Sequence, residues 1–315
     1  MSKKVPVSLI IDDSGPVNMT FFHDLGRNHE LLIPPDFLKK FVKVAQKNCI
    51  RGKFSFVPYP AGLGRVDEKV NLVPNQDLKA YLRIVREEIQ PCFSITPEIL
   101  THYRAFDLKS GRTSLHVFED VLFSTASAEE IRDYVGFALT VLQNAGLDPT
   151  GVTSPWLCGI DNEENYSKGI GCAFRKFLKK DRCFYFLHCR DEVKKPTLMC
   201  DSPETGQVIS IPDNTFDAFW GTDKTSSTLR QAKAVAKANI DNLLSEDGKS
   251  GWVRDLYERK LPITLISHWQ SLFSDGRNVG LEGLDYLVQR INRVFGNQIE
   301  WMSFAEMSEL WEVFQ

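Results

Sequence analysis

The stretch VPVSLIIDDSGP, residues 5–16, decides the expected fold of this chain. An apolar run over residues 7–11 stops at two adjacent carboxylates, Asp12 and Asp13, and Ser, Gly and Pro follow at once. Short apolar runs that end in loop-forming residues are typical of strands buried on both faces of a parallel sheet. The two acids are therefore expected at the carboxyl end of the first strand, where barrel enzymes carry their active sites.

Runs of the same kind recur along the chain, and helical patterns separate them. The expected strands cover residues 7–11, 53–57, 92–95, 151–153, 182–187, 207–211, 263–267 and 298–302. This alternation predicts an α/β fold with a parallel sheet covered by helices. For 315 residues in one expected domain, closure into a seven- or eight-stranded (β/α) barrel is the economical solution. An open doubly wound sheet is the alternative.

The intervening helices are expected from apolar residues at helical period, over residues 37–46, 78–89, 127–145, 166–177, 229–244 and 281–294. Capping-box spacing marks helix starts at Ser127 and at Ser303, and Gly146 follows a helix end. Residues 62–74 and 105–125 fit neither pattern. We expect both segments to be long loops at the carboxyl ends of strands, where function often resides.

The composition limits the classes of function. A net charge of −3, from 38 basic and 41 acidic side chains, indicates no nucleic-acid partner. No apolar run reaches the roughly 18 residues of a membrane span, and no secretory leader is expected before the first strand. The seven cysteines are scattered and never spaced as CxxC, which favours a reduced, cytoplasmic location.

Acids and histidines at strand ends are the candidates for chemistry. Neighbouring carboxylates repel each other, and they persist where a cation or a shared proton offsets the repulsion. Adjacent strand residues point to opposite faces, so one acid can bind a metal while the other serves as a base. The alternative is a loop cap beside a solvated acid. His102 and His268 also follow expected strands, and a barrel would bring these ends into one mouth.

Several stretches resemble NodB-type polysaccharide deacetylases, carbohydrate esterase family 4. LIIDDSGP is similar to that family's opening motif, with its Asp-Asp pair after the first strand. Residues 128–159 resemble its long helix and third motif, TLISHWQSLF resembles its last motif, and IEWMSFAEM resembles its terminal strand and helix. The matches run in order from residue 5 to about residue 310. The sequence most resembles a divergent intracellular subgroup that carries DDSGP and TSPW.

The resemblance implies a site of known parts. Asp12 would be the general base, Asp13 and His102 metal ligands, and His268 the general acid. The second histidine of the HxxxH-type motif departs from the pattern, because Phe106 lies four residues after His102. Two residues further along the chain are the alternatives for the missing metal ligand, namely His116 and Glu119.

The third motif of that family carries an arginine before its proline, and this chain has none. The sequence reads TSPW, so Ser154, Pro155 and Trp156 would form a wall of the substrate site without the cation. Aromatic residues are expected either to form a platform for a sugar ring or to pack in the core: Tyr59, Trp156, Trp220 and Trp269. Asp217 and Trp220 follow the sixth expected strand and could join the same mouth.

The resemblance implies a hydrolase that removes an acyl group from an N-acylated sugar or a related small amide. A divalent ion, zinc by expectation, would activate the water, and a small carbohydrate or acylated molecule would be the substrate. Two alternatives use the same fold. One is a metal-independent enzyme of the glycoside hydrolase type, and the other is a non-catalytic carbohydrate-binding barrel.

Overall fold

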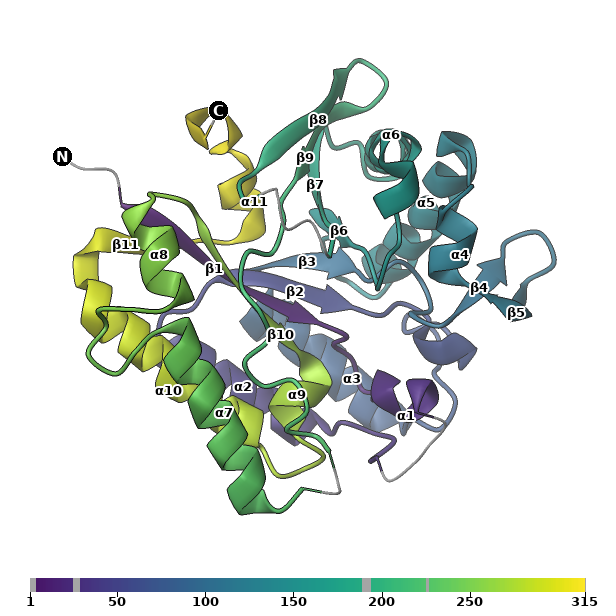
Figure 1. The fold of residues 1–315 in the computed structure, drawn as a ribbon. Helices are drawn as coiled ribbons and strands as arrows, with labels where there is room; N and C mark the ends of the chain where they lie inside the picture. Colours follow the sequence, from purple (N-terminus) through teal and green to yellow (C-terminus); the bar gives the residue numbers. More distant parts are fainter. Residues whose placement is uncertain (1–3, 25–28, 189–193, 225–226, 315) are drawn as a thin grey trace.

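The fold is built on parallel strands with helices around them, as Figure 1 shows for the computed structural model. The structure describes residues 4–24, 29–188, 194–224 and 227–314. The first sheet has the order β10–β1–β2–β3, and β11 pairs with the beginning of β1. Its strands are β1 (Val5–Asp12), β2 (Gly52–Phe56), β3 (Phe93–Pro97), β10 (Ile263–His268) and β11 (Ile299–Trp301).

A second sheet continues the first. It has the order β6–β7–β9–β8, with β6 (Gly151–Thr153), β7 (Arg182–Phe186), β8 (Thr197–Ser202) and β9 (Gly206–Ser210). All its pairs are parallel except β8 with β9. Isolated parallel bridges, Ile95 with Pro149 and Glu98 with Thr153, join β3 to the region of β6. The parallel strands therefore follow one another from β10 around to β9.

Side chains connect the two ends of this series. No ladder between β9 and β10 occurs among the described residues, but the segment after β9 bonds to β10 through Asn214 and Thr215. Asn214 Oδ1 accepts from the Thr264 backbone at 2.9 Å, and Thr215 Oγ1 donates to the Thr264 carbonyl at 3.0 Å. Polar side chains thus link the two ends of the series at a place where the described residues form no backbone ladder.

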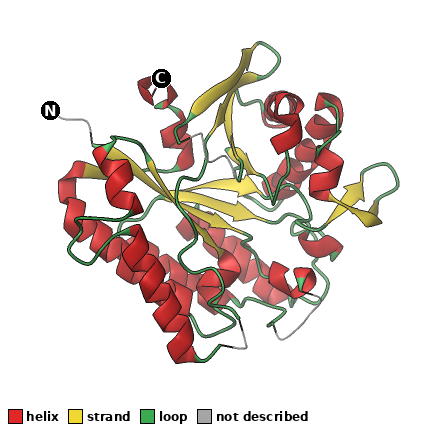
Figure 2. Ribbon diagram, viewed as in Figure 1, coloured by secondary structure: helices red, strands yellow, loops and turns green. Residues whose placement is uncertain are grey.

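Helices cover the sheets, as the colouring of Figure 2 shows. The long ones are α2 (Pro35–Lys47), α3 (Asn75–Ile84), α5 (Ala128–Asn144), α6 (Glu163–Ala173), α7 (Leu229–Leu243) and α10 (Val279–Phe295). The short ones are α1 (Met19–His23), α4 (Glu119–Phe123), α8 (Trp252–Glu258), α9 (Trp269–Phe273) and α11 (Phe304–Ser308). None of the helices in the described ranges combines the length and apolar character that a bilayer crossing requires.

Local signals in the sequence explain several helix boundaries. Ser127 and Glu130 form a reciprocal capping box at the start of α5, and Ser303 forms one with Glu306 at the start of α11. Gly146 follows α5 with φ +81°, a left-handed conformation that favours glycine. The expectations for these positions are confirmed.

The expected fold class is confirmed, and so is every expected strand. Three strands were not expected, namely β8 and the pair β4 (Arg104–Asp107) and β5 (Arg112–Phe118). The prediction of a long loop over residues 105–125 was wrong, because this segment forms the β4–β5 hairpin and α4. The hairpin projects from the body of the protein in Figure 1, so its strands lack the double-sided burial that revealed the others.

Candidate active site

The carboxyl ends of four strands meet at one side of the sheet. Asp12 ends β1 and lies opposite His268, the last residue of β10. Glu98 directly follows β3 and bridges to Thr153 at the end of β6. A cavity of about 1020 Å³ opens at this side, and its walls include Asp13, Glu98, His102, His188 and His268.

The backbone at this rim adopts unusual conformations. Asp13 has φ 60°, directly after the end of β1, and His102 has φ 49°. Ile99 and Trp156 also lie in the left-handed region, with φ 39° and 47°. Non-glycine residues in this region cost of order 1–3 kcal/mol each and tend to cluster at functional sites. Here they turn the chain so that acidic and imidazole groups face one another.

Asp13, Glu98 and His102 form a compact buried cluster. His102 Nε2 lies 2.7 Å from Asp13 Oδ1, and the Asp13 backbone N–H donates to Glu98 Oε2 at 2.6 Å. Ser55 donates to the same Glu98 oxygen at 2.5 Å, and Gln270 Nε2 donates to Asp13 Oδ2 at 2.6 Å. Each acid is therefore held in place by a neighbour that lies outside the cluster.

The three groups shift one another's protonation. Burial, together with the Asp13 charge, raises the pKa of Glu98 to about 8. Burial opposes a charge on His102, but attraction to Asp13 and Glu98 outweighs it and raises the pKa of His102 to about 9. Burial opposes the charge on Asp13 as well, yet His102 holds the Asp13 pKa well below its ordinary value. The cluster thus concentrates negative charge and retains protons to offset it.

This cluster fits a divalent ion in its donor chemistry. One ligand atom from each of Asp13, Glu98 and His102 lies within 4.8 Å of the other two, and all three residues are buried. Carboxylate oxygen and imidazole nitrogen are ligands that zinc and other first-row divalent ions accept. A cation there would also offset the repulsion that raises the pKa of Glu98.

Asp12 has entirely different surroundings. Its side chain is 0% exposed, and the ammonium group of Lys53, also 0% exposed, binds Oδ1. Lys53 Nζ donates to Thr153 Oγ1 at 2.5 Å and lies over the Phe186 ring. The TSPW motif lacks its own cation, but Lys53 brings an ammonium group from β2 to Thr153, the first residue of that motif. The adjacent acids therefore do have separate environments.

Two histidines on the cavity wall have opposite protonation. His268 Nδ1 lies 2.9 Å from Asp217 Oδ2. Burial opposes a positive charge on His268, but the hydrogen bond to Asp217 and the nearby acids outweigh burial and raise the pKa of His268 to about 10. Burial lowers the pKa of His188 to about 4, and the charge of His268 acts in the same direction. At neutral pH the cavity therefore contains a protonated imidazole beside a neutral one.

The candidate substrate-binding residues separate into two groups. Trp156 lines the cavity, with its ring 4.7 Å from that of His102, and Trp220 lines it 4.7 Å from the ring of His268. Trp269 is fully buried and packs against Phe37 at 4.7 Å. Tyr59 packs on Phe106 and is not among the residues that line this cavity.

Ser154 and Pro155 directly precede Trp156 in the chain. Both are buried, and Ser154 Oγ shares a hydrogen bond of 2.6 Å with the hydroxyl of Tyr166. Neither residue is among those that line the cavity. Their placement indicates that they hold the loop that carries Trp156.

The two alternatives for the vacant metal ligand lie apart from the cluster. His116 is exposed in β5, within the projecting hairpin of Figure 1. Glu119 is buried, but its carboxylate accepts from the backbone N–H groups of Thr101 and His102 and from the Tyr134 hydroxyl. Glu119 thus supports the loop that presents His102.

The residue that joins Asp13 and His102 is Glu98, which the motif pattern did not predict. Glu98 lies four residues before His102, so the spacing is E-x-x-x-H, whereas the HxxxH-type pattern places the second ligand four residues after the first. Lys53 and His188 were also not predicted. A lysine inside an expected buried strand was a visible signal for Lys53, since buried charges are normally paired.

Comparison with known proteins adds the fold family. No family model matches the chain, and no curated protein matches it. The solved structures include a protein from Mycobacterium smegmatis that is assigned as a polysaccharide deacetylase. It is 12% identical to this chain and superposes with a TM-score of 0.53. The match covers 99% of this chain and 91% of that protein. The chain has the NodB-type deacetylase fold.

Two further structures share this deacetylase fold. The Puue allantoinase is 10% identical with a TM-score of 0.54, covering 98% of this chain and 90% of that one. A Pseudomonas aeruginosa PAO1 protein, assigned as a polysaccharide deacetylase, is 10% identical with a TM-score of 0.52, covering 98% and 91%. The resemblance stated from the motifs is thus confirmed at the level of fold.

Proposed function

We propose that this protein is a hydrolase that removes an acyl group from an N-acylated sugar or a related small amide, with a divalent metal ion, zinc by expectation, as cofactor. One observation carries the proposal. Asp13, Glu98 and His102 form a ligand set on the wall of a cavity that also holds a protonated His268. The deacetylase fold supports the same class of reaction.

The ligand set determines where the ion would act. Asp13, Glu98 and His102 would hold it, and Gln270 and Ser55 would fix the two carboxylates through the hydrogen bonds they donate. Such an ion would lower the pKa of a bound water toward neutrality and polarise the acyl carbonyl. All three ligands are buried and also line the cavity, so a water or a substrate carbonyl could reach the ion only from the cavity side.

His268 is suited to protonate the leaving nitrogen. Its Nδ1 is held by Asp217, so Nε2 is the ring nitrogen that can donate into the cavity. With its pKa raised to about 10, the ring carries its proton throughout the neutral range. Asp12, on the neighbouring strand β1, is proposed to promote removal of the proton from the attacking water.

The cavity suits a substrate of sugar size. Its volume of about 1020 Å³ lies just above the roughly 300–1,000 Å³ typical of small-molecule sites. Trp156 and Trp220 provide aromatic faces beside the two chemical groups, against which the apolar face of a sugar ring can pack. We propose a small carbohydrate or acylated molecule as the substrate.

Metal analysis and an assay of acid release test the proposal. We expect the purified protein to contain a stoichiometric divalent ion and to release acetate from N-acetylated sugars. Asp13→Ala is expected to lose the ion and to lose activity by about 10³-fold or more, since it removes a ligand. His116→Ala, in the exposed hairpin, is the matched control and should retain both.

Two outcomes would contradict the proposal in different ways. Full activity after the ion is removed by a chelator would contradict the metal requirement and favour a metal-independent enzyme. Absence of hydrolysis by the metal-loaded protein across acylated sugars and small amides would contradict the hydrolase itself.

A further inference from the structure

Asp12 is separated from the cavity by a histidine. The Asp12 side chain is fully buried and does not line the cavity. Its Oδ2 atom lies 3.4 Å from Nε2 of His188 and has no hydrogen-bond partner among the described residues. His188 does line the cavity, with 16% of its side chain exposed. A water in the cavity therefore meets His188 before it can meet Asp12.

Lys53 prevents Asp12 from turning toward the cavity. Its ammonium group binds Asp12 Oδ1, donates to Thr153 Oγ1 at 2.5 Å and lies 4.7 Å from the centre of the Phe186 ring. Thr153 is fixed in turn by a 2.8 Å hydrogen bond with Thr96. Separating a fully buried ion pair is costly, because each charge would remain out of water without its partner. Asp12 is thus anchored behind the cavity wall.

His188 and His268 form a pair with opposite properties. Their rings are nearly parallel, with an interplanar angle of 10° and centroids 6.1 Å apart. Burial and the positive charges of His268 and Lys53 outweigh the attraction of Asp12 and Asp13, so the pKa of His188 is lowered to about 4. Titratable groups whose environments push their pKa values apart indicate which is acid and which is base. His188 carries the free electron pair that a base requires.

We propose that His188 is the catalytic base that accepts the proton of the attacking water, and that Asp12 and Lys53 are positioning residues behind it. This inference rests on the hydrolase proposed above. Nε2 of His188 lies 3.4 Å from Asp12 Oδ2, and a proton on Nε2, drawn toward that unpartnered oxygen, leaves Nδ1 as the acceptor. The arrangement has the logic of a nucleophile-activating dyad, in which a carboxylate orients an imidazole.

The proton balance of the step is complete. Nδ1 of His188 takes one proton from water as the water oxygen bonds to the acyl carbon. His268 gives one proton to the nitrogen as the carbon–nitrogen bond breaks, and the products are a carboxylic acid and an amine. His188 then releases its proton to solvent and His268 regains one, so no oxidant, reductant or further reactant is required.

Loss and chemical rescue of the imidazole test the assignment. The probes are N-acetylglucosamine, di-N-acetylchitobiose and 4-nitroacetanilide. They are assayed with the metal-loaded full chain and with its His188→Gly, Asp12→Asn and doubly substituted forms.

We expect His188→Gly to lose about 10²-fold or more in kcat, the usual contribution of a general base. Added imidazole should restore at least about tenfold in His188→Gly and nothing in Asp12→Asn. The double variant should be no worse than about threefold below His188→Gly, because residues that act as a unit are not additive.

Matched variants keep the result interpretable. His116→Gly removes an exposed histidine outside the cavity and controls for added imidazole. Each variant is checked by thermal unfolding. If His188→Gly does not fold, His188→Gln, which retains side-chain volume, replaces it, and the loss of kcat and the comparison with the double variant then decide.

If the wild type hydrolyses a probe and the kcat of the His188 variant stays within threefold of the wild-type value, the inference is overturned and the proposed function stands. Equal inactivity of His188→Gly and Asp12→Asn with no imidazole rescue overturns it as well. No hydrolysis of any probe by the wild type overturns the proposed function and this inference with it.

Discussion

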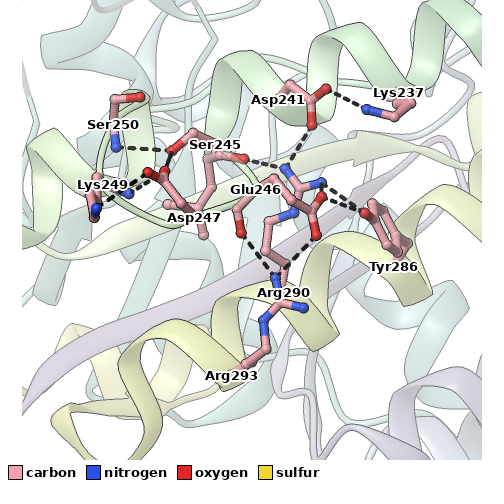
Figure 3. Close-up of polar contacts among 11 residues, drawn as sticks. Lys237, Asp241, Ser245, Glu246, Asp247, Lys249, Ser250, Tyr286, Arg290 and Arg293 are labelled. Atoms are coloured by element: carbon pink, nitrogen blue, oxygen red, sulfur yellow. Dashed lines mark hydrogen bonds and ion pairs between the residues drawn. The ribbon is translucent and has the colours of Figure 1, made fainter.

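Two buried cations in this protein look alike and differ in what surrounds them. Lys53 is fully buried beside Asp12, which is also 0% exposed. Arg290 is 1% exposed, but its partners Asp241 and Glu246 are 37% and 59% exposed. Figure 3 shows the Arg290 guanidinium bonded to both acids and to Tyr286, with Arg293 and Ser245 nearby. The Arg290 network joins α10 to the end of α7 and the residues that follow it, whereas the Lys53 pair stands directly behind the cavity wall.

The difference shows that burial of a charge does not by itself indicate function. The carboxylates of the Arg290 network retain access to water, so this network serves to hold helices together. In the Lys53 pair, Asp12 Oδ2 has no hydrogen-bond partner among the described residues and faces a cavity histidine. A buried carboxylate oxygen without a hydrogen bond lowers the stability of the fold. Proteins tend to tolerate such losses of stability at functional sites.

The largest expected effect comes from exchanging each cation for an apolar side chain. We expect Lys53→Met to lower kcat by about 10²-fold per folded molecule, because Asp12 loses its anchor behind His188. Arg290→Met should destabilise the fold by about 1–3 kcal/mol, less than the loss for a fully buried pair, because Asp241 and Glu246 keep access to water once the guanidinium is gone. Its kcat should stay within about twofold. Denaturant unfolding and steady-state kinetics on both variants check the contrast, which fails if Arg290→Met reduces kcat as strongly as Lys53→Met.

A pH profile sharpens the comparison on the acid side of the cavity. His268 faces Asp217, Asp13, Asp12 and His188, and its pKa is raised to about 10. Activity that requires the protonated ring should therefore persist through neutral pH and decline only as the pH rises toward 10. Asp217→Asn removes a hydrogen bond to the charged form, so the His268 pKa should fall and the decline should begin at least one pH unit lower. Measurement of kcat/KM from pH 6 to pH 10.5 decides; an unchanged profile would exclude His268 as the acid.

The smallest expected effect on kinetics concerns the two tryptophans. Trp220 is 59% exposed at the cavity rim, and Trp269 is fully buried. Trp220→Ala should raise KM about threefold to tenfold, the worth of one aromatic contact, with little change in kcat or stability. Trp269→Ala should destabilise the fold by about 3–5 kcal/mol through the cavity it leaves. A rise in KM for Trp269→Ala alone would reverse the assignment of the sugar platform.

Much of the architecture is predictable from local patterns along the chain. The apolar runs that form β1, β2, β7 and β10 report burial on both faces, and this is a property of the local sequence. Capping residues such as Ser127 and Ser303 determine helix starts by short-range hydrogen bonds, which are equally local. The exposed β4–β5 hairpin was not predicted because its strands lack that apolar pattern.

The sequence by itself determined the order of strands and helices, their capped ends, and the presence of acids and histidines where strands stop, because period and spacing are local properties. Only the tertiary structure decided which of these groups meet. Glu98 rather than His116 joins Asp13 and His102, since a left-handed turn at His102 and the end of β3 set their directions. Lys53 comes to Asp12 from β2, and His188 comes from the segment that follows β7. Such contacts depend on which parallel strands lie side by side. The number of residues between two side chains along the chain does not determine the distance between them in the fold.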